Sequence, residues 1–485
     1  MKNQRTNNND IKILVIYDKR NFSRQINYVF DFIFSFFDVS YKIISVENFD
    51  KNEYNLQKII IIGYGERFFD FSEYKYIHIF SSHFFGKRYF KKESLPKSPL
   101  KRVKGLPIIY PSNKEKFKLI SKTDKLIETH LDVIASVFFM LTRYEEVIIK
   151  KRDKHNRFSA DFSLAFKEKF LDRPIVDEYV NFLEGLIKNL FPKLKRKRFW
   201  GDKDFAVFLT HDIDEVRKYK WYPPFRKIFS FLVKKRAIKK AIFLFFDYLK
   251  AKLKKDPYDT FEYMINLEKK NGLKSCFYFF KKDITRKDSN FLSALNYVNK
   301  RNFEVGLHPS FNSYKSLKKI KKEKCFLEKV LGEKIYGVRQ HFLRFKVPGT
   351  WKIQKDAGFL YDSTLGFAAK PGFRCGTCFP FQPFDLIRNK KINIWEIPLI
   401  VMDRTLQSFQ YESLSTEEAQ KKIIKFVKII KKFGGVFTLL WHNSSFYDIN
   451  GWIEWDKVYQ RSIYYLKKQN AYVGFGKEIL EKFTR

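Results

Sequence analysis

Three polar side chains that can transfer protons or bind metal ions follow one apolar segment. Residues 205–214 read FAVFLTHDID, so an uncharged run ends in His211, Asp212 and Asp214. Imidazoles and carboxylates are the groups that do acid–base and metal chemistry near neutral pH. Such a run is typical of a buried parallel strand, and the carboxyl ends of these strands carry the functional groups in α/β folds. An Asp at this place is also a common helix N-cap, so a structural role stays open for this stretch alone.

Histidines recur at the ends of later strand-like segments. The chain has 8 histidines, and four of them, His211, His308, His341 and His442, lie at or just beyond such ends. Parallel strands place their carboxyl ends at one edge of a sheet. We therefore expect these imidazoles to meet the two carboxylates of the first segment in one site.

The elements that must position these side chains are strands alternating with helices. Eight segments have the character of buried strands: residues 205–214, 273–280, 303–310, 334–341, 358–364, 392–399, 434–443 and 471–475. Segments of helical period lie between most of them, for example residues 260–272 and 416–435. This alternation predicts a (β/α) barrel, or a close relative of it, over residues 201–485.

The remaining chain predicts a second domain, because 485 residues are too many for one core. Residues 1–120 read as a small α/β domain with four short buried strands, and no glycine-rich phosphate loop follows the first of them. Residues 121–200 read as a helical connecting region, in which residues 124–150 form one long helix. Its apolar face extends almost all round, which predicts burial between domains.

The net charge of +42 has two possible explanations. The protein binds an anionic partner, or its lysine content reflects the composition of an AT-rich genome. An insertion at residues 216–256 concentrates the charge: residues 216–255 hold fourteen Lys and Arg and one acidic residue, interleaved with aromatic and aliphatic ones. Two interpretations are open. The insertion is an interfacial element that contacts an anionic membrane, or a helical hairpin that packs on the barrel with its lysines in solvent.

Four cysteines do not make a disulfide framework in a chain of this length. Cys375 and Cys378 form a lone C-x-x-C, which we interpret as a packed loop. No apolar leader and no run of eighteen apolar residues is found. We therefore expect a cytoplasmic protein, peripheral at the inner membrane if the insertion binds lipid.

The order of the motifs FLTHDID, EVGLHPS, GVRQHFLRF, AGFLYDSTLGF, FRCGTCFPF, IWEIPLIVMD and LLWHNS resembles the polysaccharide deacetylase family. These are metal-dependent carbohydrate esterases that share the chitooligosaccharide deacetylase homology domain, and some bacterial members have an extra N-terminal domain. The resemblance covers residues 204–485 approximately. It implies a distorted (β/α) barrel of this type, preceded here by the smaller α/β domain.

The resemblance implies roles for individual residues, with two departures. Asp212 matches the general base, but Ile213 occupies the usual ligand position, and Asp214 is the nearest substitute. His308 matches the first metal histidine, whereas Asn312 replaces the second. His341 could replace the missing second metal histidine, and His211 is another candidate. The preferred site is Asp214 and His308, with His341 or Asn312 as the third ligand of a divalent metal ion, zinc by preference, and an open position for water.

The same resemblance supplies the rest of the catalytic site. His442 matches the catalytic acid, Arg339 matches the arginine that orients the base, and Asp362 or Asp403 orients His442. For substrate contact we name three residues, Arg374, Trp395 and Trp441.

The function implied is a hydrolase of carbon–nitrogen bonds that removes an N-acetyl group from a sugar or polysaccharide precursor, in bacterial envelope or exopolysaccharide biosynthesis. The N-acetylated substrate would be lipid-linked or nucleotide-linked. Alternatives are hydrolysis of another C–N amide or of an O-acetyl ester, and a catalytically silent sugar-binding protein that lost its metal site. Nucleic-acid binding is not expected, because no zinc finger or RNA-binding aromatic motif is present.

Overall fold

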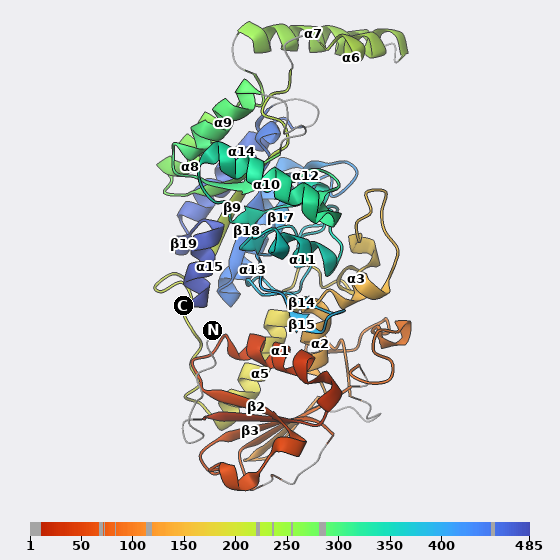
Figure 1. Ribbon diagram of the computed structural model, residues 1–485, viewed down its shortest axis with the longest axis vertical. Coiled ribbons are helices and arrows are strands. Elements are labelled where there is room, and N and C mark those ends of the chain that lie inside the picture. Colours follow the sequence, from red (N-terminus) through yellow and green to blue (C-terminus); the bar gives the residue numbers. More distant parts are fainter. Residues whose placement is uncertain are drawn as a thin grey trace. The chain divides into compact units, whose positions relative to one another are not determined.

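The computed structural model describes residues 11–66, 71, 73–82, 84–112, 119–219, 224–234, 237–253, 256–280, 288–447 and 452–485 (Figure 1). The chain divides into two compact units. The N-terminal unit contains Met1–Asp202, Val347–Lys352 and Phe373–Trp395, and the C-terminal unit contains Lys203–Lys346, Ile353–Gly372 and Glu396–Arg485. Two short segments from late in the sequence thus belong to the unit that is formed mainly by the first 202 residues.

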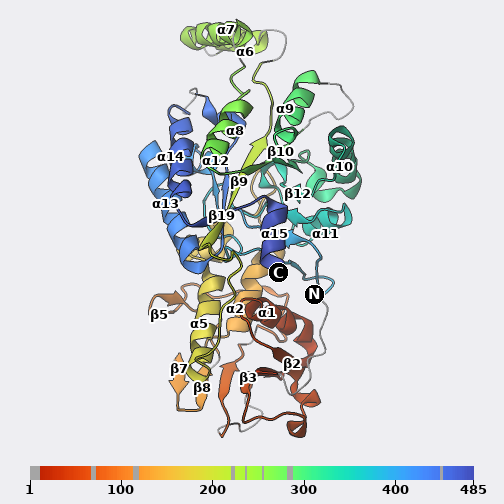
Figure 2. The ribbon, with the colours of Figure 1, turned by 90° about the vertical axis from the view of Figure 1, so that its left-hand side faces the viewer.

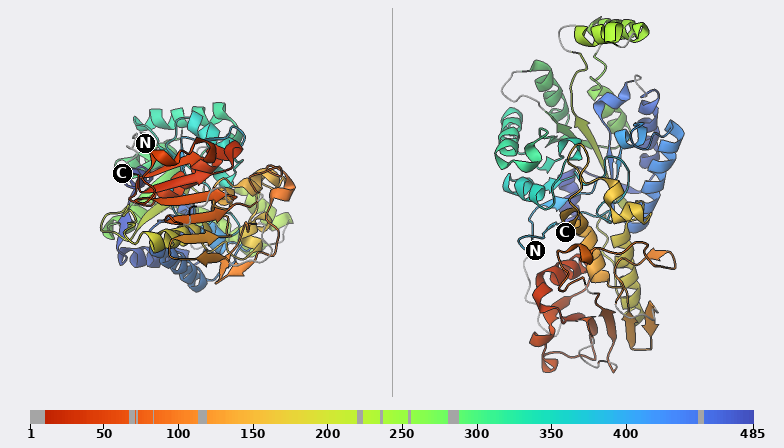
Figure 3. Two further views of the ribbon diagram at one scale, coloured as in Figure 1. Left: turned by 90° about the horizontal axis from the view of Figure 1, so that it is seen from below. Right: turned by 90° about the vertical axis from the view of Figure 1, so that its right-hand side faces the viewer.

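The N-terminal unit is built on a six-stranded sheet, seen in Figure 3 (left). The order is β2 (Tyr41–Ser45), β1 (Ile13–Tyr17), β3 (Ile60–Gly65), β4 (Tyr76–Phe80), β8 (Leu126–Thr129) and β7 (Ile120–Lys122). The strands pair in parallel except β7, which is antiparallel to β8. The central strand β1, ILVIY, is buried at every position, as expected for a β-branched run covered on both faces. The four strands predicted for this region, β1 to β4, are confirmed.

Helices of the N-terminal unit correct one prediction. The helices are α1 (Ser23–Phe34), α2 (Val133–Leu141), α3 (Tyr144–Ile148), α4 (Leu164–Lys167) and α5 (Ile175–Leu190). A single helix over residues 124–150 is wrong: this stretch begins with strand β8, and α2 and α3 are separated at Arg143, whose φ of 51° is left-handed. All nine residues of α2 are buried, which explains the apolar character all round this helix.

The C-terminal unit is built on a nine-stranded sheet that is parallel wherever its strand pairs are described (Figure 2). Its order is β16 (Trp395–Glu396), β13 (Tyr361–Asp362), β12 (Gly337–Val338), β11 (Glu304–Leu307), β10 (Ser275–Phe279), β9 (Phe205–Ile213), β18 (Val436–Leu440) and β17 (Val401–Met402), and β19 (Ala471–Val473) also pairs with β9. The eight predicted strands are confirmed, and β17 was not predicted. The fold is therefore the expected α/β one, a curled parallel sheet related to a (β/α) barrel.

Helices lie around the outside of this sheet (Figures 2 and 3). They include α8 (Phe261–Lys270), α9 (Ser289–Asn299), α10 (Leu317–Leu331), α11 (Gly349–Asp356), α12 (Asp403–Gln407), α13 (Thr416–Phe433), α14 (Trp455–Lys467) and α15 (Gly476–Thr484). The predicted helices at residues 260–272 and 416–435 are confirmed as α8 and α13. Helix α13 begins with a capping box between Ser415 and Glu418 and ends at Gly434, whose φ of 77° suits a residue without a Cβ.

The basic insertion forms helices. Within residues 216–256 lie α6 (Phe225–Phe229), a π-helical turn at Ser230–Lys234, and α7 (Ile238–Leu253). Residues 220–223, 235–236 and 254–255 lie outside the described residues. Among the helices that the structure describes, none is both long and apolar enough to cross a bilayer.

Candidate functional site

The carboxyl ends of four strands of the C-terminal unit supply the site. Asp212 is the last residue but one of β9, and Asp214 follows that strand directly. His308 follows β11, and His341 begins the 3-10 turn after β12. His442 follows β18, two residues beyond its last residue. The register of the sheet thus brings the predicted side chains to one edge, as parallel strands require.

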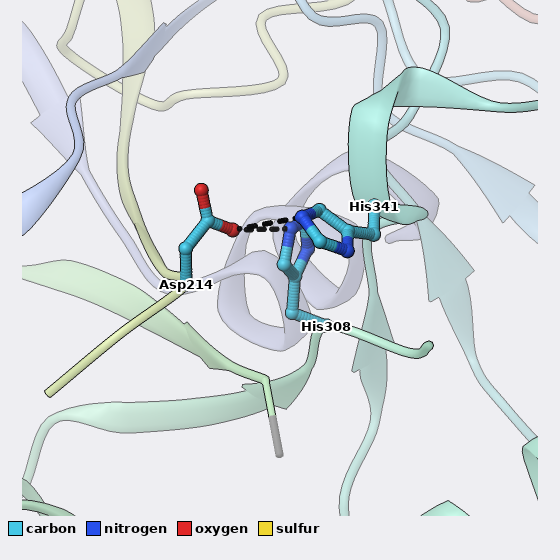
Figure 4. Close-up of side chains that lie close together, drawn as sticks. All are labelled: Asp214, His308 and His341. Carbon is cyan, nitrogen blue, oxygen red and sulfur yellow. Dashed lines mark ion pairs between the residues drawn. The ribbon is translucent and has the colours of Figure 1, made fainter. Parts of the chain in front are cut away.

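Asp214, His308 and His341 form a group that can hold a metal ion (Figure 4). Asp214 Oδ1 lies 3.2 Å from His308 Nε2 and 3.3 Å from His341 Nε2. Ligands about 2.0–2.2 Å from a tetrahedral zinc ion stand roughly 3.3 Å apart, so these separations suit such an ion. In the described part of the chain no second group of three His, Cys, Asp or Glu side chains meets this criterion.

Hydrogen bonding around the group also fits a cation. His308 Nδ1 lies 2.7 Å from the carbonyl oxygen of Arg339, to which it donates, so that Nε2 is the nitrogen that faces Asp214. Asp214 Oδ1 is buried and, among the described residues, accepts no hydrogen bond that meets geometric criteria. A buried carboxylate oxygen without a donor is costly, and a metal ion would satisfy it.

The protonation states of Asp214 and His341 favour the binding of a metal ion. Burial alone would raise the pKa of Asp214, but the neighbouring imidazoles, with His308 the foremost, outweigh burial and hold that pKa well below its usual value. Burial, together with the charge of His308, lowers the pKa of His341 to about 3. Asp214 is therefore ionised and His341 neutral, which are the forms that bind metal ions. For His308, burial is outweighed by Asp212 and Asp214, which raise its pKa, so binding a cation would displace its proton.

Asp212 lies beside this group and near Arg339. Asp212 Oδ2 is 3.8 Å from His308 Nε2, and Asp212 Oδ1 is 3.6 Å from Arg339 Nη1. Arg339 is fully buried and is held by Thr210 Oγ1 at 2.7 Å and by the carbonyl and hydroxyl oxygens of Ser363. Asp212 Oδ1 has no hydrogen-bond donor in the described structure, so it can accept a proton.

His442 approaches the same group from β18. Its Nε2 lies 3.9 Å from Asp214 Oδ2. Its Nδ1 lies 2.7 Å from Asp403 Oδ1, while its backbone N–H donates to Asp403 Oδ2, also at 2.7 Å. Burial would lower the pKa of His442, but the Asp403 carboxylate raises it to about 9. His442 is therefore an imidazolium at neutral pH and can donate a proton from Nε2.

Two of the proposed metal ligands have other partners. Both ring nitrogens of His211 are engaged, with the Trp441 carbonyl at 2.7 Å and Glu268 Oε1 at 2.8 Å, so His211 supports the core. Asn312 is exposed, and its Oδ1 accepts a hydrogen bond from Arg344 Nη1 at 3.2 Å. Of the two alternatives for the third ligand, the structure brings His341 to Asp214 and His308.

The three residues named for substrate contact are not brought together. Arg374 lies in the N-terminal unit, buried, with its guanidinium paired with Glu146 at 2.7 Å. Trp441 is fully buried, and its ring packs against Trp455 and Tyr459. Trp395 is half-buried at the start of β16. Burial of Arg374 and Trp441 leaves neither side chain a free face for a sugar ring, and substrate contact by Trp395 stays a prediction.

Sequence reasoning left some supporting residues undecided or unnamed. Asp403 was one of two candidates for orienting His442, and the other, Asp362, instead bonds Gln354 and Thr364. Thr210 and Ser363, which hold Arg339, were not named. Thr210 lies next to His211 within β9, and Ser363 directly follows β13 next to Asp362, and this closeness to named residues is the signal that could have found them.

Comparisons with known proteins give one family model and several solved structures. Residues 14–192 match a family model described as a family of unknown function (DUF7033). The comparison with curated proteins finds no match.

Solved structures resemble 57–58% of the chain. A protein from Mycobacterium smegmatis assigned to the polysaccharide deacetylases is 16% identical, with 91% of that chain covered and a TM-score of 0.40. PuuE allantoinase is 11% identical, with 91% covered and a TM-score of 0.39. A CE4 family pseudoenzyme from Bacillus anthracis, BA3943, is 12% identical, with 66% covered and a TM-score of 0.29. Because these proteins differ in what they do, function has to be argued from the residues of this chain.

Proposed function

We propose that the C-terminal unit is a metal-dependent hydrolase that removes the N-acetyl group from a sugar or polysaccharide precursor. The observation that supports this most directly is the meeting of three kinds of group at one sheet edge. They are a ligand set for a divalent ion (Asp214, His308 and His341), a carboxylate that can accept a proton (Asp212), and a charged imidazole (His442). Metal-dependent amide hydrolysis uses all three functions.

The ligand set is one carboxylate and two imidazoles, a combination that suits zinc and leaves a coordination position open. Asp214 keeps 35% of its side chain exposed, so water and substrate can reach it. A divalent ion bound here would supply a Lewis acid for the acetyl carbonyl and would lower the pKa of a water molecule towards 7.

Asp212 is the general base of the proposal. It takes the proton of the attacking water on Oδ1 or Oδ2 while Arg339 keeps its carboxylate oriented. Arg339 cannot itself move, because Thr210 and Ser363 fix three of its nitrogens.

His442 is the general acid. The nitrogen of the cleaved amide leaves as an amine only if it is protonated, and His442 Nε2 donates that proton. Asp403 stabilises the imidazolium before this step and fixes the ring through Nδ1.

The test is acetate release from a panel of N-acetylhexosamine and oligosaccharide substrates, with and without a chelator, alongside O-acetylated sugars. We expect release from N-acetylated substrates that stops with chelator and returns with zinc. Faster release from the O-acetyl esters would assign the site to ester hydrolysis. Absence of both activities in protein with full metal content would overturn the proposal.

The metal ligands are tested separately by measuring bound metal in purified protein. His308→Ala should lose the ion, whereas His155→Ala, which removes a partly exposed imidazole of the N-terminal unit, should keep it. Full occupancy in His308→Ala would remove His308 from the ligand set. The biosynthetic pathway, the lipid or nucleotide carrier of the sugar, and the cytoplasmic location stay predictions.

A further inference from the structure

The helical insertion of the C-terminal unit has an unusual surface. Eleven of the nineteen exposed large hydrophobic side chains of the described chain lie within residues 225–253. They are Phe225, Phe229, Leu232, Val233, Ile238, Ile242, Phe243, Phe245, Phe246, Leu249 and Leu253, and their exposed fractions reach 64% at Phe225 and 84% at Leu253. Scattered exposed apolar residues are ordinary, but a concentration of this kind marks an interaction surface.

The exposed apolar side chains of α7 form one stripe. Ile238, Ile242, Phe245, Phe246, Leu249 and Leu253 recur at steps of three and four residues, which places them on one face of a helix. Lys239, Lys250 and Lys252 are exposed beside this stripe. Ala241 and Tyr248 are buried, so the helix packs through a different face. The outward face of α7 is thus apolar with a cationic border.

The one acidic residue among residues 216–255 does not reduce this positive charge at the surface. Asp247 is 5% exposed, because it accepts hydrogen bonds from Lys218 Nζ at 2.8 Å and from the hydroxyls of Tyr219 and Tyr447. The sequence of residues 216–255 holds no other acidic residue among its fourteen Lys and Arg. A surface that combines cationic and apolar side chains suits anionic headgroups with acyl chains beneath them.

The same contacts attach the insertion to the loops of the proposed site. Lys218 and Tyr219 follow Asp214 closely in the chain, and their backbone N–H groups donate to Asp256 at 2.8 and 3.2 Å. Tyr447 lies in the loop that follows His442. Between the two loops, Asn443 Nδ2 donates to the carbonyl oxygens of Glu215 and Tyr258, both at 2.9 Å. The two loops that carry Asp214 and His442 thus also hold the base of the insertion.

We propose that the outward face of α6 and α7 docks on an anionic phospholipid bilayer and thereby delivers the site to N-acetylated sugars carried by a lipid. The docking stands on the surface described above, whereas the choice of substrate rests on the proposed deacetylase function. Nucleic acid would use the cationic side chains but gives no partner to the apolar stripe. Several basic residues near an anionic leaflet, together with inserted aromatic rings, suffice for peripheral binding.

The docking is tested with the full chain by co-sedimentation with vesicles of phosphatidylcholine, alone or mixed with phosphatidylglycerol. We expect binding to the mixed vesicles that weakens as salt is raised. The double variant Ile242→Ser/Phe246→Ser should bind roughly tenfold more weakly or worse, and Lys239→Glu/Lys250→Glu should lose its preference for anionic vesicles. Phe409→Ser is the matched control, since Phe409 is 83% exposed and lies outside the insertion.

The outcomes separate the two proposals. Vesicle binding that is equal in wild type and Ile242→Ser/Phe246→Ser, or no binding at all, would overturn the docking. A different outcome is that the wild type does not bind vesicles but sediments as a dimer, and that Ile242→Ser/Phe246→Ser sediments as a monomer. That result would instead assign the surface to a second copy of the chain. Acetate release from a water-soluble N-acetylated oligosaccharide should be unchanged in the variant, while release from a vesicle-embedded N-acetylated glycolipid should fall roughly tenfold. Vesicle binding without acetate release from either substrate would retain the docking and refute the proposed function.

Discussion

At the scale of single residues, the site depends on a division of charge among neighbours. Asp214 is held ionised, His341 neutral and His442 protonated, although all three lie within one cluster. The cause differs in each case: imidazoles surround Asp214, burial acts on His341, and the Asp403 carboxylate contacts His442. In the proposed mechanism, this difference separates the metal ligands Asp214 and His341 from the proton donor His442.

The role of His442 is tested by His442→Ala. We expect kcat on an N-acetylated sugar to fall by roughly 100-fold or more, because the leaving amine loses its proton donor. Metal content should be unchanged, since His442 Nε2 lies 3.9 Å from Asp214 and outside the ligand set. Near-wild-type turnover would remove His442 from the mechanism.

Asp403 should set the alkaline limit of activity. The acid form of His442 is required, so the rate of the wild type is expected to fall as pH rises through about 9, the pKa to which Asp403 raises this imidazole. Asp403→Asn removes the carboxylate that raises the pKa of His442 most, so this pKa should fall below about 9 even though Asp212 and Asp214 remain. The pH–rate profile should therefore lose activity at lower pH in Asp403→Asn. Asp362→Asn changes a buried carboxylate that bonds Gln354 and Thr364, and should leave the alkaline limit in place.

Most of the site could be predicted from residue type and position alone. Asp212, Asp214, His308, His341 and His442 all stand at strand ends, and a parallel sheet brings such positions together. Burial could not be predicted in the same way. Trp441 follows a strand like the others, yet its ring packs against Trp455 and Tyr459 from a helix distant in sequence. Only tertiary packing distinguishes a ring that faces substrate from one that faces the core.

At the scale of elements, the pattern of apolar residues predicted the strands correctly, but it wrongly predicted one helix over residues 124–150. Residues 124–150 are apolar nearly all round, and an apolar run without clear periodicity does not separate a buried strand from a buried helix. The structure resolves the stretch into β8, α2 and α3, with a left-handed Arg143 between the helices. The guanidinium of Arg143 bonds Glu145 and Glu146, and these buried ion pairs fix the break. Strand β17, Val401–Met402, was not predicted.

Helix α5 carries a testable linkage between stability and pH. Asp177, fully buried in its first turn, accepts hydrogen bonds from Thr377 Oγ1 at 2.6 Å and Cys378 N at 2.9 Å, and burial raises its pKa from 3.8 to about 6. The folded state thus binds this proton more tightly than the unfolded state. This proton contributes about 3 kcal/mol to the free energy of unfolding. The contribution is complete below pH 3.8 and is lost as the pH rises through about 6.

Asp177→Asn does not titrate, so its unfolding free energy relative to wild type should rise by about 3 kcal/mol between pH 4 and pH 7. Denaturant unfolding of both proteins at each pH measures the difference. Asp161→Asn, at an exposed acid of the same unit, is the control and should show no such change. A constant difference between Asp177→Asn and wild type would contradict the linkage.

At the scale of the whole molecule, the units are interleaved in sequence. Val347–Lys352 and Phe373–Trp395 belong to the N-terminal unit although the C-terminal unit surrounds them in the chain. Within the N-terminal unit, Arg374 pairs with Glu146, and Thr377 and Cys378 bond Asp177, all in buried surroundings. The sequence suggested consecutive domains, since no local pattern shows which distant partner completes a core.

A truncated chain of residues 203–485 should therefore fold poorly. It retains Arg374 and the buried segment around Cys378 but lacks Glu146 and Asp177, and an unpaired buried charge costs several kcal/mol. We expect aggregation or a broad, low-temperature unfolding transition in circular dichroism, in contrast to the full chain. A sharp transition and full metal binding in residues 203–485 would show that the late segments do not need the first unit.

The interleaving also sets an order of events during synthesis. About 170 residues separate Asp202 from Phe373, so at roughly 5–20 residues per second the first unit waits on the order of ten to thirty seconds for its last segment to leave the ribosome. During that interval Arg143 and Glu146 have no Arg374 beside them, and the site around Asp177 stays open. Most of the C-terminal unit's chain up to Gly372 is therefore synthesised before the segment that completes the N-terminal unit.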